Sequence, residues 1–153
     1  MDIRPRIAIV VSTYNASVTE RMHKGAVACL GRAGLSDGAI TTLRVPGAWE
    51  LPLAVRWALA GHDAAIALGA VIKGETTHDE HINRTVSLLL GQLAVESGKP
   101  VGFGLLTCLT MEQAIQRAGG NVGNKGEEAA SAVLAMLDLA RSAPPSGPRP
   151  AAV

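Results

Sequence analysis

Two kinds of segment alternate along the chain. Short, almost uninterrupted apolar runs occupy residues 6–12, 40–45, 64–73 and 101–107, and each predicts a strand buried on both faces. Longer segments lie between and after them, and their apolar residues recur every three or four positions, which is typical of helices that bury one face. Strand–helix alternation of this kind predicts a parallel sheet covered by helices on both sides.

The expected helices are delimited by capping patterns and breakers. A capping residue followed three positions later by Glu or Gln predicts a helix start at Ser17, Thr77, Thr110 and Asn124. A further helix is expected from about Trp49 to Ala60, with its proline tolerated in the first turn. The positions expected to face inward are Val18, Met22, Ala26, Leu30, Ile82, Val86, Leu89, Leu90, Leu93, Val133, Leu134 and Leu137.

These elements predict an α/β fold, specifically a flavodoxin-like three-layer αβα sandwich with a four-stranded parallel sheet. We expect residues 1–142 to form a single domain, because 153 residues fit one domain with a sizeable core. Residues 143–153 are rich in proline and cannot continue a helix, so we expect a mobile tail there.

Composition excludes several classes of protein. A content of 48% hydrophobic and 18% charged residues excludes a disordered chain. The net charge is +1 and no basic stripe appears, which argues against nucleic acid as a partner. The apolar run at residues 64–72 is shorter than the roughly 20 residues that a membrane span needs, and the first six residues lack the apolar core of a signal peptide.

The cysteines and histidines give no metal-ligand spacing. Cys29 and Cys108 lie in apolar surroundings and are interpreted as reduced, buried thiols, as expected of a cytoplasmic protein. His23, His62 and His81 are expected at the surface, and no pairing among them predicts a metal site.

Candidate chemistry gathers at the carboxyl ends of the expected strands, where parallel α/β sheets bind ligands. Tyr14 follows the first strand and Trp49 the second, although the whole chain holds only four aromatic residues. Flat rings at strand ends either form a slot for a planar heterocycle or simply plug the end of the sheet. Spacing alone leaves both interpretations open.

The polar residues at this edge also allow two interpretations. Glu50 either caps its helix or accepts hydrogen bonds from ligand hydroxyl and N–H groups. Glu75 and Thr76 lie in a loop before a helix start, where free N–H groups and hydroxyls can hold a phosphate. His78 is either a structural histidine or a group that exchanges protons near neutral pH. Arg117 is a solvated helix-end residue or a fork for phosphate oxygens.

Taken in order, four motifs resemble the lumazine synthase family, which acts in riboflavin biosynthesis. They are VPGAWELP at residues 45–52, ALGAVIKGETTH at 67–78, EQAIQRAG at 112–119 and NKGEEAA at 124–130. Each motif alone is modest, but the ordered set is specific, and the likeness covers about residues 6–140. The first motif of the family commonly reads Arg-Phe-Asn, whereas this chain has Thr13-Tyr14-Asn15, and Trp49 replaces a common Phe. The residues after His78 are Asp79-Glu80-His81, where the family often has aromatics flanking an acidic residue.

The resemblance implies an enzyme that condenses 5-amino-6-(D-ribitylamino)uracil with 3,4-dihydroxy-2-butanone 4-phosphate to 6,7-dimethyl-8-ribityllumazine. Phosphate and water are released, and no metal or cofactor is implied. His78 would be the proton shuttle. The implied contacts to the ribitylaminouracil are Tyr14, Ala48, Trp49, Glu50, Ala70, Val71, Ile72, Phe103 and Lys125. The implied contacts to the butanone phosphate are Glu75, Thr76 and Arg117.

The resemblance further implies a homopentamer, in which Phe103, Arg117 and Lys125 reach the site of the adjacent subunit. Pentamer and larger shell stay open, because no insertion interrupts the chain before Asn124. The alternatives are a non-catalytic flavin- or lumazine-binding protein and a purely structural shell protein. A signalling receiver domain shares the fold class but needs acidic residues at the ends of the first and third strands, and residues 11–13 and 72–74 contain none.

Overall fold

The central sheet is all parallel, as expected from the strand–helix alternation. The structure is a computed structural model that describes residues 4–142; the expected tail at 143–153 lies outside the described residues. Its strands are β1 (Ile7–Ser12), β2 (Ile40–Val45), β3 (Ala64–Ile72) and β4 (Val101–Cys108). They lie in the order β2-β1-β3-β4, so two central strands are flanked by two edge strands. The predicted α/β sandwich is confirmed.

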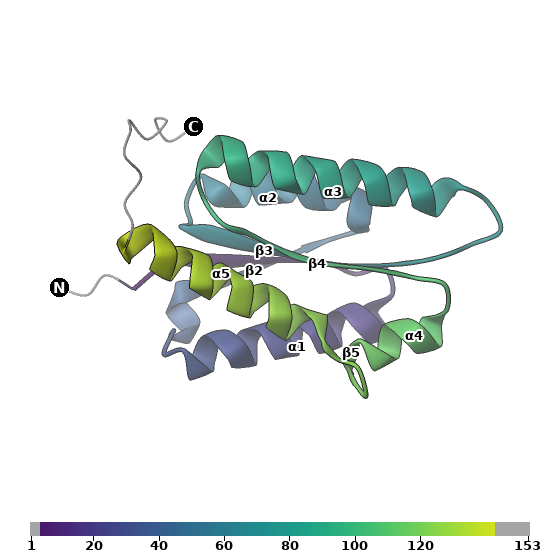
Figure 1. Ribbon diagram of the computed structural model, residues 1–153, viewed down its shortest axis with the longest axis horizontal. Coiled ribbons are helices and arrows are strands. Elements are labelled where there is room, and N and C mark those ends of the chain that lie inside the picture. Colours follow the sequence, from purple (N-terminus) through teal and green to yellow (C-terminus); the bar gives the residue numbers. More distant parts are fainter. Residues whose placement is uncertain (1–3, 143–153) are drawn as a thin grey trace.

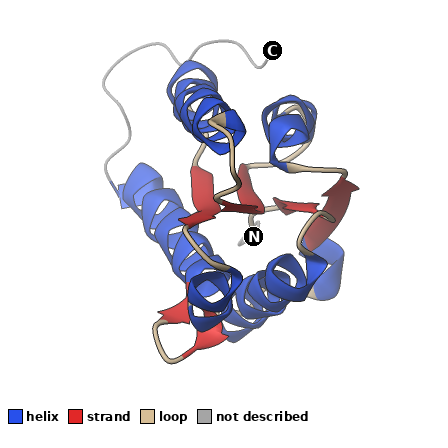
Figure 2. Cartoon of the chain, turned by 90° about the vertical axis from the view of Figure 1, so that its right-hand side faces the viewer, coloured by secondary structure: helices blue, strands red, loops and turns tan. Residues whose placement is uncertain are grey.

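Two layers of helices cover the sheet. Figure 1 shows α2 (Leu51–Leu59) and α3 (His78–Ser97) on one side and α1 (Ala16–Arg32), α4 (Met111–Gln116) and α5 (Lys125–Ser142) on the other, and Figure 2 shows the same arrangement from the end. Successive side chains of a strand point to opposite faces, so β1 contributes to both cores. Ile9 packs in the cluster beneath α1 and α5, and Val10 packs in the cluster beneath α2 and α3. Both are fully buried, as a central strand between two helix layers requires.

The cap of the first helix lies two residues earlier than the capping pattern predicts. Its N-cap is Asn15, which has a left-handed backbone (φ 59) and no side-chain cap bond, so the expected capping role of Ser17 was wrong. The amide of Asn15 donates instead to the carbonyl of Ala70, at 2.8 Å, because asparagine tolerates left-handed φ and carries a donor. The inner face is as expected, with Val18, Met22, Ala26 and Leu30 buried.

The second helical segment is divided. Residues Ala48–Glu50 form a 3-10 turn, η2, and α2 follows directly from Leu51. A second 3-10 turn, η1 (Asp37–Ala39), leads into β2. The expected continuous helix from Trp49 is therefore tighter in its first turn, which directs Trp49 away from the core.

Helix α3 follows the pattern except at one position. Val86 and Leu90 are buried and Ile82 and Leu93 pack partly against the same core, but Leu89 is 39% exposed, so its placement on the inner face was wrong. Thr77 occupies the N-cap position without making a side-chain cap bond. The helix ends at Gly98, whose φ of 66 is a typical left-handed stop.

The last part of the chain contains a small hairpin that the pattern did not predict. Strands β5 (Ala118–Gly120) and β6 (Gly123–Asn124) pair antiparallel between α4 and α5. The two flanking caps were predicted correctly: the Thr110 hydroxyl accepts from the Gln113 N–H at 3.2 Å, and the side-chain Oδ1 of Asn124 accepts from the backbone N–H groups of Gly126 and Glu127. The Asn124 amide also donates to the Arg21 carbonyl, which ties α5 to α1. Leu134 and Leu137 are only half-buried on α5.

The cysteines and two histidines differ from expectation in burial. Cys29 and Cys108 are free but half-buried rather than fully buried. His23 and His62 are half-buried, because each ring bonds to a threonine of the edge strand β2, whereas His81 is exposed as predicted. Between residues 4 and 142 no helix combines the length and the apolar character that a membrane crossing requires.

Candidate active site

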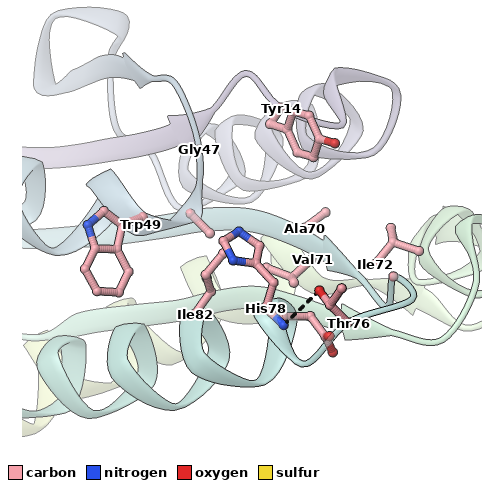
Figure 3. A pocket seen from close by; sticks show the side chains of 12 residues that line it. Tyr14, Gly47, Trp49, Ala70, Val71, Ile72, Thr76, His78 and Ile82 are labelled. Carbon is pink, nitrogen blue, oxygen red and sulfur yellow. Dashed lines mark hydrogen bonds between the residues drawn. The ribbon is translucent and has the colours of Figure 1, made fainter.

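A cavity of about 350 Å³ opens at the carboxyl ends of β1, β2 and β3. Figure 3 shows its lining from close by. The loops and helices that follow the strands contribute most of its lining, and the end of β3 contributes the rest, which is where parallel sheets place ligands. The lining residues are Tyr14, Gly47, Ala48, Trp49, Ala70, Val71, Ile72, Gly74, Thr76, His78, Asp79 and Ile82.

The two aromatic rings are held at the rim by backbone bonds of their loops. The Tyr14 N–H donates to the Pro46 carbonyl at 3.0 Å, which links the loop after β1 to the loop after β2. Asn15 then fixes the same loop to β3 through its bond to Ala70. Tyr14 is 72% exposed and Trp49 57% exposed, so both rings present free faces instead of plugging the sheet. Their faces are available to a flat ligand.

His78 is the first residue of α3 and is exposed. Figure 3 shows its imidazole directed from the helix toward the cavity, between Trp49 and Val71. Its backbone N–H is directed to the Thr76 hydroxyl at 3.4 Å, so the loop and the helix start are joined at this point. Within residues 4–142 no side-chain hydrogen bond or ion pair engages the imidazole, which leaves both ring nitrogens available to a ligand.

The two glutamates expected at this edge lie outside the lining. The Glu50 carboxylate accepts from the Gly47 N–H at 3.0 Å, within its own 3-10 turn. That bond corresponds to the capping role, one of the two interpretations of Glu50 that the sequence left open. Glu75 is exposed in the loop before α3 and is not among the lining residues, whereas its neighbour Thr76 is.

Phe103 and Lys125 line a different groove, of about 540 Å³, between β4, α5 and the end of α3. Phe103 is 43% exposed on the edge strand, and Lys125 pairs with Glu128 at 3.3 Å. Within one chain these two residues are therefore separated from the His78 cavity.

Arg117 lies at the end of α4, where its guanidinium donates to the Gln113 carbonyl at 3.2 Å. Burial raises the pKa of the neighbouring Cys108 thiol, and the positive charge of Arg117 partly opposes that rise. The cation therefore lies near the carboxyl end of β4, although it is not in the lining of the cavity.

The charge of the cavity is unusual for a site expected to hold a phosphate. Among its lining residues, all within the described part of the chain, none is Lys or Arg. A phosphate dianion here finds hydroxyls and backbone N–H groups but no cation of the same chain. In residues 4–142 no group of three His, Cys, Asp or Glu side chains is arranged to hold a metal ion.

Four lining residues were not predicted as site residues from the sequence: Gly47, Gly74, Asp79 and Ile82. Ile82 follows His78 by one helical turn and therefore shares its face, a spacing that the sequence already contains. In the sequence Asp79 stood out only as a residue after His78 where the family often has an aromatic. Which way its side chain turns depends on the packing of α3 on the sheet.

Comparison with known proteins gives one consistent answer. The family model described as 6,7-dimethyl-8-ribityllumazine synthase matches residues 4–141. A protein of that name from Rhodopirellula baltica is 59% identical over 136 residues, which is 88% of either chain. Others of that name, from Chlorobium phaeobacteroides and Anaeromyxobacter dehalogenans, are 45% and 42% identical over 89% and 90% of this chain, and over 89% and 86% of their own lengths. The matched region contains the whole cavity, and the chain therefore belongs to the 6,7-dimethyl-8-ribityllumazine synthase family.

Proposed function

We propose that this chain catalyses the condensation of 5-amino-6-(D-ribitylamino)uracil with 3,4-dihydroxy-2-butanone 4-phosphate to 6,7-dimethyl-8-ribityllumazine, with release of phosphate and water. The observation that carries the proposal is the cavity that joins Tyr14, Trp49, Thr76 and His78 at one edge of the sheet in a member of this family. It offers faces for a flat ring, a hydroxyl beside a helix start and a group that exchanges protons.

Each residue has a proposed task. Tyr14 stacks on the pyrimidine ring, and Ala48, Trp49 and Glu50 contact the ribityl chain and neighbouring polar groups. The backbone of residues 70–72 contacts the ring at the end of β3. Glu75 and Thr76 hold the phosphate-bearing substrate at the start of α3, where free N–H groups and the helix dipole favour an anion.

The chemistry needs positioning more than a reactive side chain. The uracil 5-amine attacks the ketone and loses water to form an imine, phosphate is eliminated, and the ribitylamine closes the ring with loss of a second water. Holding both substrates in the reacting geometry lowers the activation free energy by up to about 7–11 kcal/mol. His78 moves protons between the amines, the hydroxyls and water, which contributes about 10²–10⁴-fold.

The missing cation supports a site shared between subunits. The cavity has no Lys or Arg of its own chain, whereas Arg117 and Lys125 are displayed elsewhere on the surface. We propose a cytoplasmic homopentamer in which Phe103, Arg117 and Lys125 complete the cavity of the adjacent subunit. Arg117 then binds the phosphate, and Phe103 and Lys125 contact the ribitylaminouracil.

The test mixes the purified protein with both substrates and follows the absorbance of the lumazine and the inorganic phosphate together. Equal amounts of the two products are expected. A protein that binds the diamine without releasing phosphate is a binding protein and contradicts the proposal. The mass of the particle in solution tests the pentamer, and complementation between a His78→Ala chain and an Arg117→Ala chain tests the shared site. Mixed pentamers of these variants regain sites in which His78 and Arg117 from different subunits are both intact.

A further inference from the structure

Asp79 is the one acidic residue among those that line the cavity, all of which lie within the described part of the chain. It lies in the first turn of α3, directly after His78, and is half-buried. Its Oδ1 is enclosed and has no hydrogen-bond partner. No ion pair within residues 4–142 reaches this carboxylate either.

The carboxylate is therefore divided between two environments. The enclosed Oδ1 lies against the protein. Oδ2 has no hydrogen-bond partner within residues 4–142 and is not among the enclosed atoms that lack one, so it keeps contact with solvent. Because Asp79 lines the cavity, a ligand bound there lies beside this residue. A charged acceptor makes the stronger kind of hydrogen bond.

Asn83 lies one helical turn after Asp79 and is also half-buried. Its Oδ1 is the other enclosed side-chain oxygen of α3 without a partner. The oxygen and nitrogen of an amide exchange places without a change of shape, and the NH₂ group is then the donor that an enclosed carboxylate oxygen lacks. At a spacing of four residues such a donor lies on the same side of α3 as Asp79.

Charge decides what Asp79 favours. A carboxylate attracts N–H donors and the cationic imine formed from an amine, and it opposes a phosphate dianion. The cavity has to accept one substrate rich in N–H groups and one phosphate ester. A cavity that holds only phosphate-bearing molecules is an unproductive complex, and a carboxylate that repels phosphate disfavours it.

We propose that Asp79 is a further specificity-determining residue of this cavity: its carboxylate accepts an N–H of the diaminouracil and disfavours phosphate in that place. Asn83 is the positioning residue behind it. The inference rests on the proposed function, because it takes the diaminouracil as the ligand.

The test compares Asp79→Asn with the unaltered protein in two measurements that do not need turnover. Calorimetry measures the Kd of 5-amino-6-(D-ribitylamino)uracil alone. Competition between inorganic phosphate and this uracil measures the affinity of phosphate. Replacing the charge by a neutral isostere is expected to weaken diamine binding about tenfold and to tighten phosphate binding about threefold. Asn83→Ala is expected to weaken binding of the diamine by a smaller factor. Asp79→Glu keeps the charge and is expected to retain part of the affinity that Asp79→Asn loses.

Glu80→Gln is the matched control, because Glu80 is exposed in the same helical turn and does not line the cavity. It removes the same charge and is expected to leave both affinities within twofold. Opposite shifts for the two ligands distinguish a charge effect from a loosened fold, which weakens both. Equal affinities in Asp79→Asn and the unaltered protein, or parallel losses for both ligands, overturn the proposal.

Turnover separates the two levels of inference. An unaltered protein that binds the diamine but forms no lumazine contradicts the proposed function, and the role of Asp79 is then still decided by the two affinities. An unaltered protein that does not bind the diamine overturns both.

Discussion

Helix α5 approaches the backbone of α1 closely at Gly126, in its first turn. A Cβ built there lies 2.0 Å from the carbonyl oxygen of Met22, and 2.6 and 2.8 Å from its C and Cα. Ordinary van der Waals contact begins near 3.4 Å, so Gly126→Ala requires a displacement of roughly 1.4 Å. The obstacle is the backbone of α1, which cannot rotate aside as a flexible side chain does.

The expected free energy follows from three effects. Overpacking against a backbone costs about 1–3 kcal/mol. A displaced α5 also loses its cap, because Asn124 holds the Gly126 N–H at 2.9 Å and the Arg21 carbonyl at 3.2 Å, at a cost of about 1 kcal/mol. Replacing a helical glycine by alanine by itself raises the free energy of unfolding by about 0.5–1 kcal/mol. We therefore expect Gly126→Ala to lower the free energy of unfolding by about 1–3.5 kcal/mol.

The assay is urea unfolding at one fixed protein concentration, since assembly contributes to apparent stability. Gly31→Ala is the matched control: it lies in α1, and a Cβ there meets nothing within 4 Å. It is expected to stabilise the chain by about 0.5–1 kcal/mol. A Gly126→Ala chain as stable as Gly31→Ala would refute the reasoning about the contact between α1 and α5.

Four further predictions follow from individual contacts. His78→Ala should lower kcat by no more than about 10²–10⁴-fold and leave measurable turnover; a folded variant with none contradicts catalysis by positioning. Arg117→Ala should chiefly raise the KM for the butanone phosphate, and an unchanged KM removes Arg117 from that role. Asn15→Gly keeps the left-handed backbone but loses the bond to Ala70. It should cost about 1 kcal/mol in urea unfolding and raise the KM for the diamine; unchanged values for both would show that this bond does not hold Tyr14. Burial lowers the pKa of His23, with the Glu20 charge opposing that shift. The unfolded chain therefore takes up the proton first, and stability is lost as pH falls from about 6.5 through the lower folded pKa. His23→Gln should flatten unfolding free energies measured across that window, and an unchanged pH dependence would contradict this account.

The elements of this fold were predictable because each has a local cause. The four apolar runs became the four strands within one or two residues, since a run without polar positions is stable only where both faces are covered. The cap at Thr110 needed only its own side chain and the N–H of Gln113 three residues later. The inner face of α1 followed from helical spacing alone.

The errors arose where a distant segment decides the conformation. Ser17 has a capping pattern, but Asn15 begins the helix because its amide bonds to Ala70 on β3. His23 was expected at the surface, but Thr42 on β2 accepts or donates at 2.9 Å and keeps its ring half-buried. Neither partner is near in sequence, so neither contact has a local signal.

The sequence by itself determined the order of strands and helices, the chemistry available at the strand ends and, through its ordered motifs, the family. Only the tertiary structure decided which of those groups share a cavity. It placed Tyr14, Trp49 and His78 together and left Phe103 and Lys125 in a separate groove. It also enclosed one oxygen of the cavity residue Asp79 without a partner. The physical reason is that a side chain's environment is set by the segments packed around it, and local pattern does not specify how those segments meet.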